Sequence, residues 1–212
     1  MIFPKVVMSS VVVLGIMAMS NNAKASITNA NHHSPQIYLS KLIVQSDTTV
    51  NPLAAEIANL EIERVLLLSR YTLNSPQVVA TNNKIQDTRN RYMQARGNNA
   101  LLNQTIANAL VNKIASLEVE TALLYARYPQ HSPQIITAES DVTGLRDRLS
   151  KLNLRNHKST LNSAVSQAIK NKISQLQQEI IQLKARYQIN SVEVITAQEK
   201  VRFLQKRLST LI

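Results

Sequence analysis

The sequence predicts an all-α protein built from three tandem αα-hairpins, coiled-coil-like helical repeats of 57 to 59 residues that follow a signal peptide. Three observations predict this fold. Apolar residues recur at alternating steps of four and three, the spacing of a heptad seam on a helix. An Arg-Tyr motif followed by Ser occurs three times, with its tyrosines 57 and 59 residues apart. The chain also has no Cys, no Trp and only 3 Gly, which suits long helices better than a compact enzyme core.

The N-terminus is typical of an export signal. Lys5 precedes an apolar run of 14 residues, and the letters AKAS at its end fit a small-x-small cleavage pattern. The run is too short for a membrane-spanning helix, which needs about 20 apolar residues. We therefore expect residues 1–25 to be a signal peptide cleaved after Ala25, and the mature chain to be soluble in the periplasm or outside the cell. Residues 26–50 predict an irregular N-terminal segment, because a short apolar run does not distinguish helix from strand.

Each of the ranges 51–96, 97–152 and 153–212 predicts one helical hairpin. Polar linkers at residues 97–99 and 153–160 separate one hairpin from the next. On the first helices, the seam is predicted at Leu53, Ile57, Leu60, Arg64, Leu67, Tyr71, Leu110, Ile114, Leu117, Thr121, Leu124, Tyr128, Ile169, Ile173, Leu176, Ile180, Leu183 and Tyr187. On the second helices, it is predicted at Val78, Ile85, Thr88, Tyr92, Ala95, Ile135, Val142, Leu145, Leu149, Leu152, Val194, Val201, Leu204, Leu208 and Leu211.

The thrice-repeated motif is interpreted as the corner of each hairpin. An arginine in the last turn of the first helix complements the helix dipole, three residues turn the chain, and a serine caps the second helix before a first-turn proline. The corner residues are Arg70, Tyr71, Ser75, Pro76, Arg127, Tyr128, Ser132, Pro133, Arg186, Tyr187 and Ser191. The alternative is a binding site used three times, because an Arg-Tyr pair at an exposed tip can meet a partner.

No pattern in the sequence predicts catalysis, a cofactor or a metal site. The four histidines lack metal-ligand spacing, and nucleophile, metalloprotease and phosphate-loop signatures are absent. The pairs Glu61 with Glu63 and Glu118 with Glu120 are two residues apart and so point to different helix faces. We interpret them as solvated flanks of the seam. An enzyme would need a polar pocket, for which the seams leave little room.

Positive charge gathers in the last third of the chain. The formal net charge is +11, and residues 153–212 hold ten basic but only three acidic residues. A candidate polyanion face comprises Lys170, Lys172, Lys184, Arg186, Lys200, Arg202, Lys206 and Arg207. Such a face attracts an acidic polysaccharide or an anionic membrane surface. The alternative is a solvated face of a basic coiled coil. Nucleic acid is disfavoured because few aromatic residues are interleaved with the cations.

The stretch ARYPQHSPQIITAESDVTGLRDRLSKL resembles the coiled-coil segment of bacterial polysaccharide chain-length determinant and exopolysaccharide export proteins. The resemblance covers residues 51–212 and implies a role in polysaccharide export or assembly at the cell envelope. Members of that family carry membrane helices at both ends, and some carry a kinase domain with a Walker loop. This sequence departs from that pattern, so the resemblance implies a free-standing coiled-coil array, without chain-length-regulating activity and without mapped catalytic residues.

These observations predict an exported, non-enzymatic scaffold or adaptor of the cell envelope. We expect it to bind a protein partner, or a second copy of itself, through its apolar helical seams. The alternative function is a polyanion-binding module that uses the basic third hairpin.

Overall fold

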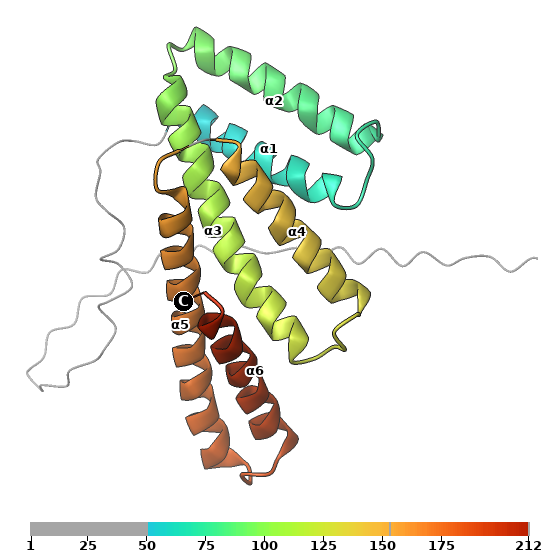
Figure 1. Cartoon of the computed structure of the whole chain (residues 1–212), viewed down its shortest axis with the longest axis vertical. Helices are drawn as coiled ribbons and strands as arrows, with labels where there is room; N and C mark the ends of the chain where they lie inside the picture. The colour runs from blue at the N-terminus through green and yellow to red at the C-terminus, as the bar shows by residue number, and fades with distance from the viewer. Residues whose placement is uncertain (1–50, 153, 212) are drawn as a thin grey trace, which may run out of the picture. The chain divides into compact units, whose positions relative to one another are not determined.

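The computed structural model describes residues 51–152 and 154–211, which form six α-helices and no strand (Figure 1). The prediction of an all-helical fold is therefore confirmed. The predicted signal peptide, residues 1–25, and the irregular segment, residues 26–50, lie outside the described residues. In chain order the helices are α1 (Pro52–Leu68), α2 (Pro76–Gln94), α3 (Asn99–Tyr125), α4 (Pro133–Ser150), α5 (His157–Arg186) and α6 (Val192–Ser209). None of these helices combines the length and apolar character that crossing a membrane requires.

Short polar residues start the helices, as their capping preference predicts. Asn51 caps α1 by accepting a hydrogen bond from the backbone N–H of Leu53, 3.0 Å from its Oδ1. The corner serines Ser75, Ser132 and Ser191 occupy the N-cap positions of α2, α4 and α6. Only the Ser191 hydroxyl accepts a capping hydrogen bond, from the N–H of Val194 at 3.4 Å, so the predicted side-chain capping by Ser75 and Ser132 is wrong. Pro76 and Pro133 open α2 and α4, where a missing N–H costs nothing because the helix has no acceptor for it.

The predicted place of the corner arginines is wrong in two of three cases. Because α1 ends at Leu68 and α3 at Tyr125, Arg70 and Arg127 lie in the turn beyond the last helical turn. Only Arg186 lies in the last turn of its helix. The backbone N–H groups of Arg70 and Arg127 instead bond to carbonyls three residues earlier, which tightens the chain into the corner.

Both linkers begin and end earlier in the chain than the sequence predicted: they span residues 95–98 and 151–156. Asn98 caps α3 through its side chain, so this linker ends before Asn99. The predicted linker at residues 153–160 ends earlier still, because α5 already begins at His157. Gly97 closes the end of α2 by donating its N–H to the carbonyl of Tyr92, at 2.9 Å. A side chain there would collide with the buried Tyr92 ring, which explains the glycine.

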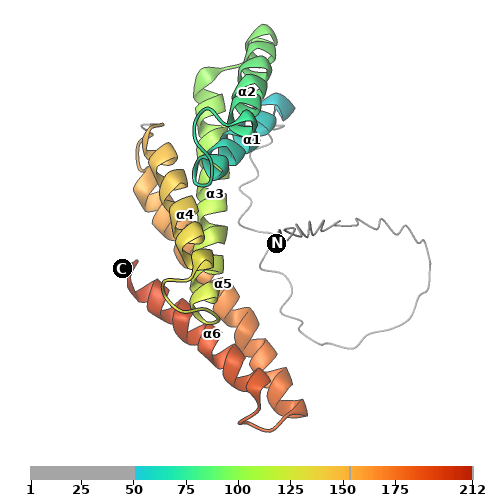
Figure 2. The same ribbon diagram turned by 90° about the vertical axis from the view of Figure 1, so that its right-hand side faces the viewer.

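Consecutive helices pack against each other as a first, second and third helix pair: α1 with α2, α3 with α4, and α5 with α6. The first helix of a pair also contacts both helices of the next pair, so α1 touches α3 and α4, and α3 touches α5 and α6. Figures 1 and 2 show the three pairs following one another in chain order. Each of the helices α1 and α3 must therefore bury two faces.

Most predicted seam positions are buried, but the three tyrosines are not. Ile57, Ile114 and Leu204 are completely buried, whereas Tyr71, Tyr128 and Tyr187 are exposed. The predicted seam also missed a second buried stripe on the first helices. This stripe comprises Ala54, Ala58, Glu61 and Val65 on α1, and Val111, Ala115, Glu118 and Ala122 on α3. We call it the coupling stripe, because it gives α1 and α3 a second buried face in addition to the one that packs on the other helix of the same pair.

Candidate functional site: arginine–glutamate clusters and the clefts between helix pairs

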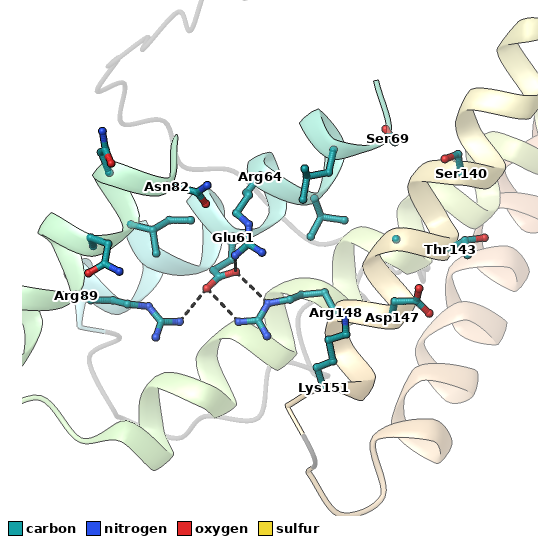
Figure 3. Close-up of a pocket in the computed structure, with 16 residues that line it drawn as sticks. Glu61, Arg64, Ser69, Asn82, Arg89, Ser140, Thr143, Asp147, Arg148 and Lys151 are labelled. Atoms are coloured by element: carbon teal, nitrogen blue, oxygen red, sulfur yellow. Dashed lines mark hydrogen bonds and ion pairs between the residues drawn. The ribbon is translucent and has the colours of Figure 1, made fainter. Parts of the chain in front are cut away.

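A buried glutamate joins the first helix pair to the second. The Glu61 side chain, on α1, is only 2% exposed. Its Oε1 accepts a hydrogen bond from Arg89 of α2 at 2.8 Å, and Arg148 of α4 donates Nε and Nη2 to the two carboxylate oxygens at 3.0 Å each. Arg64 adds an ion pair one helical turn away, at 3.5 Å. Figure 3 shows Glu61 between these side chains; we call them the first cluster.

The same arrangement recurs 57 residues later. Glu118 of α3 is 3% exposed and follows Glu61 at the repeat spacing. Arg146 of α4 donates to its Oε1 at 2.7 Å. Arg207 of α6, from the third pair, donates Nε and Nη2 to the two oxygens, both at 2.7 Å. In both clusters a bidentate arginine comes from the next pair. The glutamate's own pair contributes one arginine to the second cluster and two, Arg64 and Arg89, to the first.

The interpretation of Glu61 and Glu118 as solvated flanks is therefore wrong. It holds only for their neighbours Glu63 and Glu120, which are exposed. The repeat spacing is the sequence signal that could have identified these glutamates. Glu61 and Glu118 occupy equivalent positions in the first two copies, and the third copy has Gln177 there. No described helix follows α6, so a buried carboxylate at position 177 would have no arginine of a next pair to bind.

Both buried carboxylates stay ionised. Burial alone raises the pKa of Glu61, but the hydrogen bond and charge of Arg148, with the charges of Arg89 and Arg64, outweigh it and hold that pKa below the ordinary value of 4.5. Burial likewise opposes ionisation of Glu118, and Arg207 and Arg146 together lower its pKa below 4.5. The pKa of Arg207 is correspondingly raised by its hydrogen bond to Glu118.

Each cluster forms the floor of a cleft between helix pairs. The first cleft, of about 1010 Å³, lies between α1, α2 and α4. The second, of about 760 Å³, lies at the equivalent place between α3, α4 and α6. The sequence predicted little room for a polar pocket, and this expectation is wrong. It counted one apolar seam per helix, whereas the docking of one pair on the next creates a groove lined by polar residues.

A second polar contact closes the end of the first cleft. Asp141 of α4 is buried and accepts hydrogen bonds from the Ser69 hydroxyl and from Nη2 of Arg70, the latter at 3.0 Å. The corner arginine of the first pair thus bonds to the second pair. The third copy carries Lys200 at the position equivalent to Asp141, so this contact is specific to the first two pairs.

The corner tyrosines are exposed in all three copies. The exposed fraction of the side chain is 46% for Tyr71, 39% for Tyr128 and 48% for Tyr187. The β-branched doublet that follows each corner is split: its first member is buried and its second is exposed. The buried residues are Val78, Ile135 and Val194, and the exposed ones are Val79, Ile136 and Ile195. In Figure 2 the turns between α1 and α2 and between α3 and α4 face the viewer, and the turn between α5 and α6 lies at the lower end of the helical unit.

The predicted polyanion face is divided by the structure. Five of its residues are exposed on α5 and α6, and they are Lys170, Lys184, Arg186, Arg202 and Lys206. Lys172 and Lys200 are half-buried. Arg207 donates two hydrogen bonds to the buried Glu118, so its assignment to an outer polyanion face is wrong. Arg202 pairs with Glu199 at 2.7 Å and lies over the Phe203 ring.

Comparison with protein-family models, with curated proteins and with solved structures found no match to this chain. Within residues 51–152 and 154–211, no group of three or more histidine, aspartate and glutamate side chains is placed to hold a metal ion. Function must therefore be argued from the clusters, the clefts and the exposed corners.

We predict that Glu61→Ala lowers the free energy of unfolding by about 2–3 kcal/mol, because it leaves three arginines around an uncompensated buried site. The arginines are partly exposed, which keeps the loss below that of a fully buried pair. Urea unfolding followed by circular dichroism measures it. The matched control is Glu63→Ala, two residues away and exposed, which we expect to cost less than about 0.5 kcal/mol. Equal losses in both variants would refute the cluster's role.

Stability should also fall in acid because of these two carboxylates. A carboxylate whose folded pKa lies below its unfolded value contributes its full stability above about pH 4.5, and this contribution is lost as the pH falls through the folded pKa. We therefore expect wild type to be more stable than the double variant Glu61→Gln, Glu118→Gln at pH 7, with the difference shrinking towards pH 3. Urea titrations at several pH values measure this. A difference independent of pH would contradict the assignment.

Proposed function

We propose that this protein is an exported, non-enzymatic scaffold or adaptor of the cell envelope, built as three tandem αα-hairpins at residues 51–96, 97–152 and 153–212. The pairwise packing of consecutive helices supports the hairpins. The recurrence of the arginine–glutamate cluster at the repeat spacing supports their tandem order. Export rests on the signal-like first 25 residues.

The observation that carries the scaffold proposal is the exposure of the same apolar groups at every corner. Each corner presents one tyrosine and one branched aliphatic side chain to solvent. Tyrosine is enriched at the centres of protein interfaces because it buries a large area and retains a polar end. Three such corners in succession offer a partner protein three equivalent contacts, whose affinities multiply when they are engaged together.

The sequence predicts that a partner binds the apolar seams. The burial of the seam residues favours a different surface for the partner. Seam residues such as Ile114, Leu145 and Leu204 are completely buried between the chain's own helices. Partner binding through them would require the pairs to separate. We therefore assign the partner surface to the corners, and we assign no self-association to the seams. A role in polysaccharide export stays the proposed cellular context, on the resemblance of the repeated corner.

Binding rather than catalysis is also favoured by the state of the buried carboxylates. Glu61 and Glu118 are each held by arginines, with pKa values below 4.5. A general base or acid needs a pKa near the operating pH and a free proton-accepting position. The two glutamates have neither, so their arrangement suits a structural ion pair.

The alternative function is polyanion binding by the third hairpin. The supporting observation is that five basic side chains of the candidate face are exposed on α5 and α6. Such binding would weaken steeply between low and physiological salt, because the charges are screened over about 8–10 Å. An apolar corner contact would not.

The test that separates the two is photo-crosslinking in cells, with a crosslinking amino acid placed at Tyr71, Tyr128 or Tyr187 in turn. We expect one protein partner to crosslink at all three positions and to remain bound at high salt. The matched control places the same amino acid at Asn90, an exposed residue of α2 away from the corner, which should not crosslink. The alternative function predicts a different result: the protein is recovered with an anionic polymer that dissociates at high salt. This polymer should no longer be recovered with a variant in which Lys170, Lys184 and Lys206 are changed to Gln.

A further inference from the structure

The two clefts are equivalent in the repeat but differ in their walls, and the difference points to a ligand. Both floors carry a buried glutamate, an arginine of the same pair and a bidentate arginine of the next pair. The second cluster shows that two arginines suffice to hold the glutamate. An additional arginine in the first cleft, or a smaller residue in its wall, is therefore not needed to hold the buried glutamate.

The first cleft has one such additional arginine. Arg64 lies where the second cleft has Thr121. Three arginines around one carboxylate leave a surplus of positive charge, and the rim residues Asp147 and Lys151 cancel each other. Within the described residues, Nε of Arg64 and Nε of Arg89 are buried without a hydrogen-bond acceptor. Both guanidinium groups are therefore under-paired, and they can meet a ligand in the cleft through their terminal Nη groups.

The first cleft also has more room. Gly144 occupies the wall position that Phe203 fills in the second cleft. There the Phe203 ring stacks on Tyr125 with ring centroids 6.3 Å apart, which narrows the groove. A Cβ atom on Gly144 would lie 3.0 Å from Cγ1 of Val65. The glycine therefore leaves space for the Val65 side chain and adds no side chain of its own to the wall of the cleft. In the second copy the sizes are reversed, with Ala122 facing Phe203.

The rest of the lining combines polar uncharged side chains with the apolar Val65, Leu68 and Ile85. The polar ones include Asn82 and Asn83 on α2 and Ser140 and Thr143 on α4, and the Thr143 hydroxyl donates to the carbonyl of Glu139. Such groups both donate to and accept from the hydroxyls of a ligand. Arginine is the side chain best suited to a planar or tetrahedral oxyanion, because it donates in a fixed fork.

We propose that the first cleft is a binding site for an oxyanion, phosphate or carboxylate, carried on a hydroxyl-rich molecule such as a sugar phosphate or a uronic acid. Arg64 and Arg89 bind the anionic group with the terminal Nη–H donors that Glu61 does not engage, while Glu61 holds Arg89 in place. The amide and hydroxyl side chains of α2 and α4 contact the hydroxyls. This site is separate from the basic third hairpin and adjoins only the first corner, through Ser69, and it does not depend on the proposed function.

The test is a titration of the full chain with inorganic phosphate, observed through the arginine Nε–H resonances by NMR. We expect the Arg64 and Arg89 signals to shift saturably, and the Arg202 signal not to follow them. The chosen variant is Arg64→Thr, which copies the second cleft and leaves Glu61 with two arginines. It should fold and weaken phosphate binding by at least about tenfold, the loss of one charged hydrogen bond.

Arg91→Thr is the matched control: it makes the same change in charge at an exposed position of α2 that does not line the cleft. It should bind phosphate like wild type. A second variant, Val65→Ala with Gly144→Phe, rebuilds the narrower wall of the second cleft and should also lose binding. Absence of saturable shifts in wild type, or equal weakening by Arg64→Thr and Arg91→Thr, would overturn the proposal.

Three further probes test whether the bound anion is a phosphate or a carboxylate, and whether the hydroxyl groups of the ligand contribute to binding. Glucose 6-phosphate and glucuronate carry the two anionic groups on the same hydroxyl-rich frame, and glucose carries neither. We expect one of the two anionic probes to bind more tightly than free phosphate and glucose not to bind. If free phosphate binds as tightly as both sugars, the polar lining has no role and the hydroxyl-rich part of the proposal is wrong.

Discussion

The architecture depends on a buried carboxylate that two helix pairs share. Taking an ionised glutamate out of water costs several kcal/mol, and this cost is offset only when well-oriented partners replace the water. Glu61 has its full set of arginines only after the second pair has docked, since Arg148 comes from α4. A slipped register would leave a buried charge unpaired. The arginine–glutamate cluster therefore selects one register among those that the apolar seams alone would allow.

The same principle explains part of the charge distribution. The coupling stripe is made of small, apolar and glutamate residues on α1 and α3. On α5 the equivalent residues, all exposed, are Lys170, Ser174, Gln177 and Ile181. Within the described residues, no further helix pair covers this stripe of α5, so a lysine is accommodated where α1 and α3 have Ala54 and Val111. Arg207 belongs to the second cluster rather than to the outer face.

The sequence predicts the helices well, because their starts are marked locally: Asn51, Asn98 and Ser191 cap α1, α3 and α6 through their side chains, and Pro76 and Pro133 open α2 and α4. It places Tyr71 wrongly, since a heptad pattern does not show where the seam stops and the corner begins. Glu61 and Glu63 are locally indistinguishable, and only docking of another pair makes one buried and the other exposed. Comparison of the copies contains part of that information: Glu61 and Glu118 stand at equivalent positions and are buried, whereas their equivalent Gln177 is exposed on α5. The first cleft was missed because it arises from long-range docking around Gly144.

The most direct test of this account is a double-mutant cycle between Glu61 and Arg148, with each residue changed to Ala singly and together, measured by urea unfolding. If the two pairs are joined by this contact, the two substitutions will be coupled by more than about 1 kcal/mol. The exposed pair Glu199 and Arg202, one helical turn apart on α6, should couple by less than about 0.5 kcal/mol. Additive losses at Glu61 and Arg148 would contradict the account, since the pairs would then be held together by apolar packing alone.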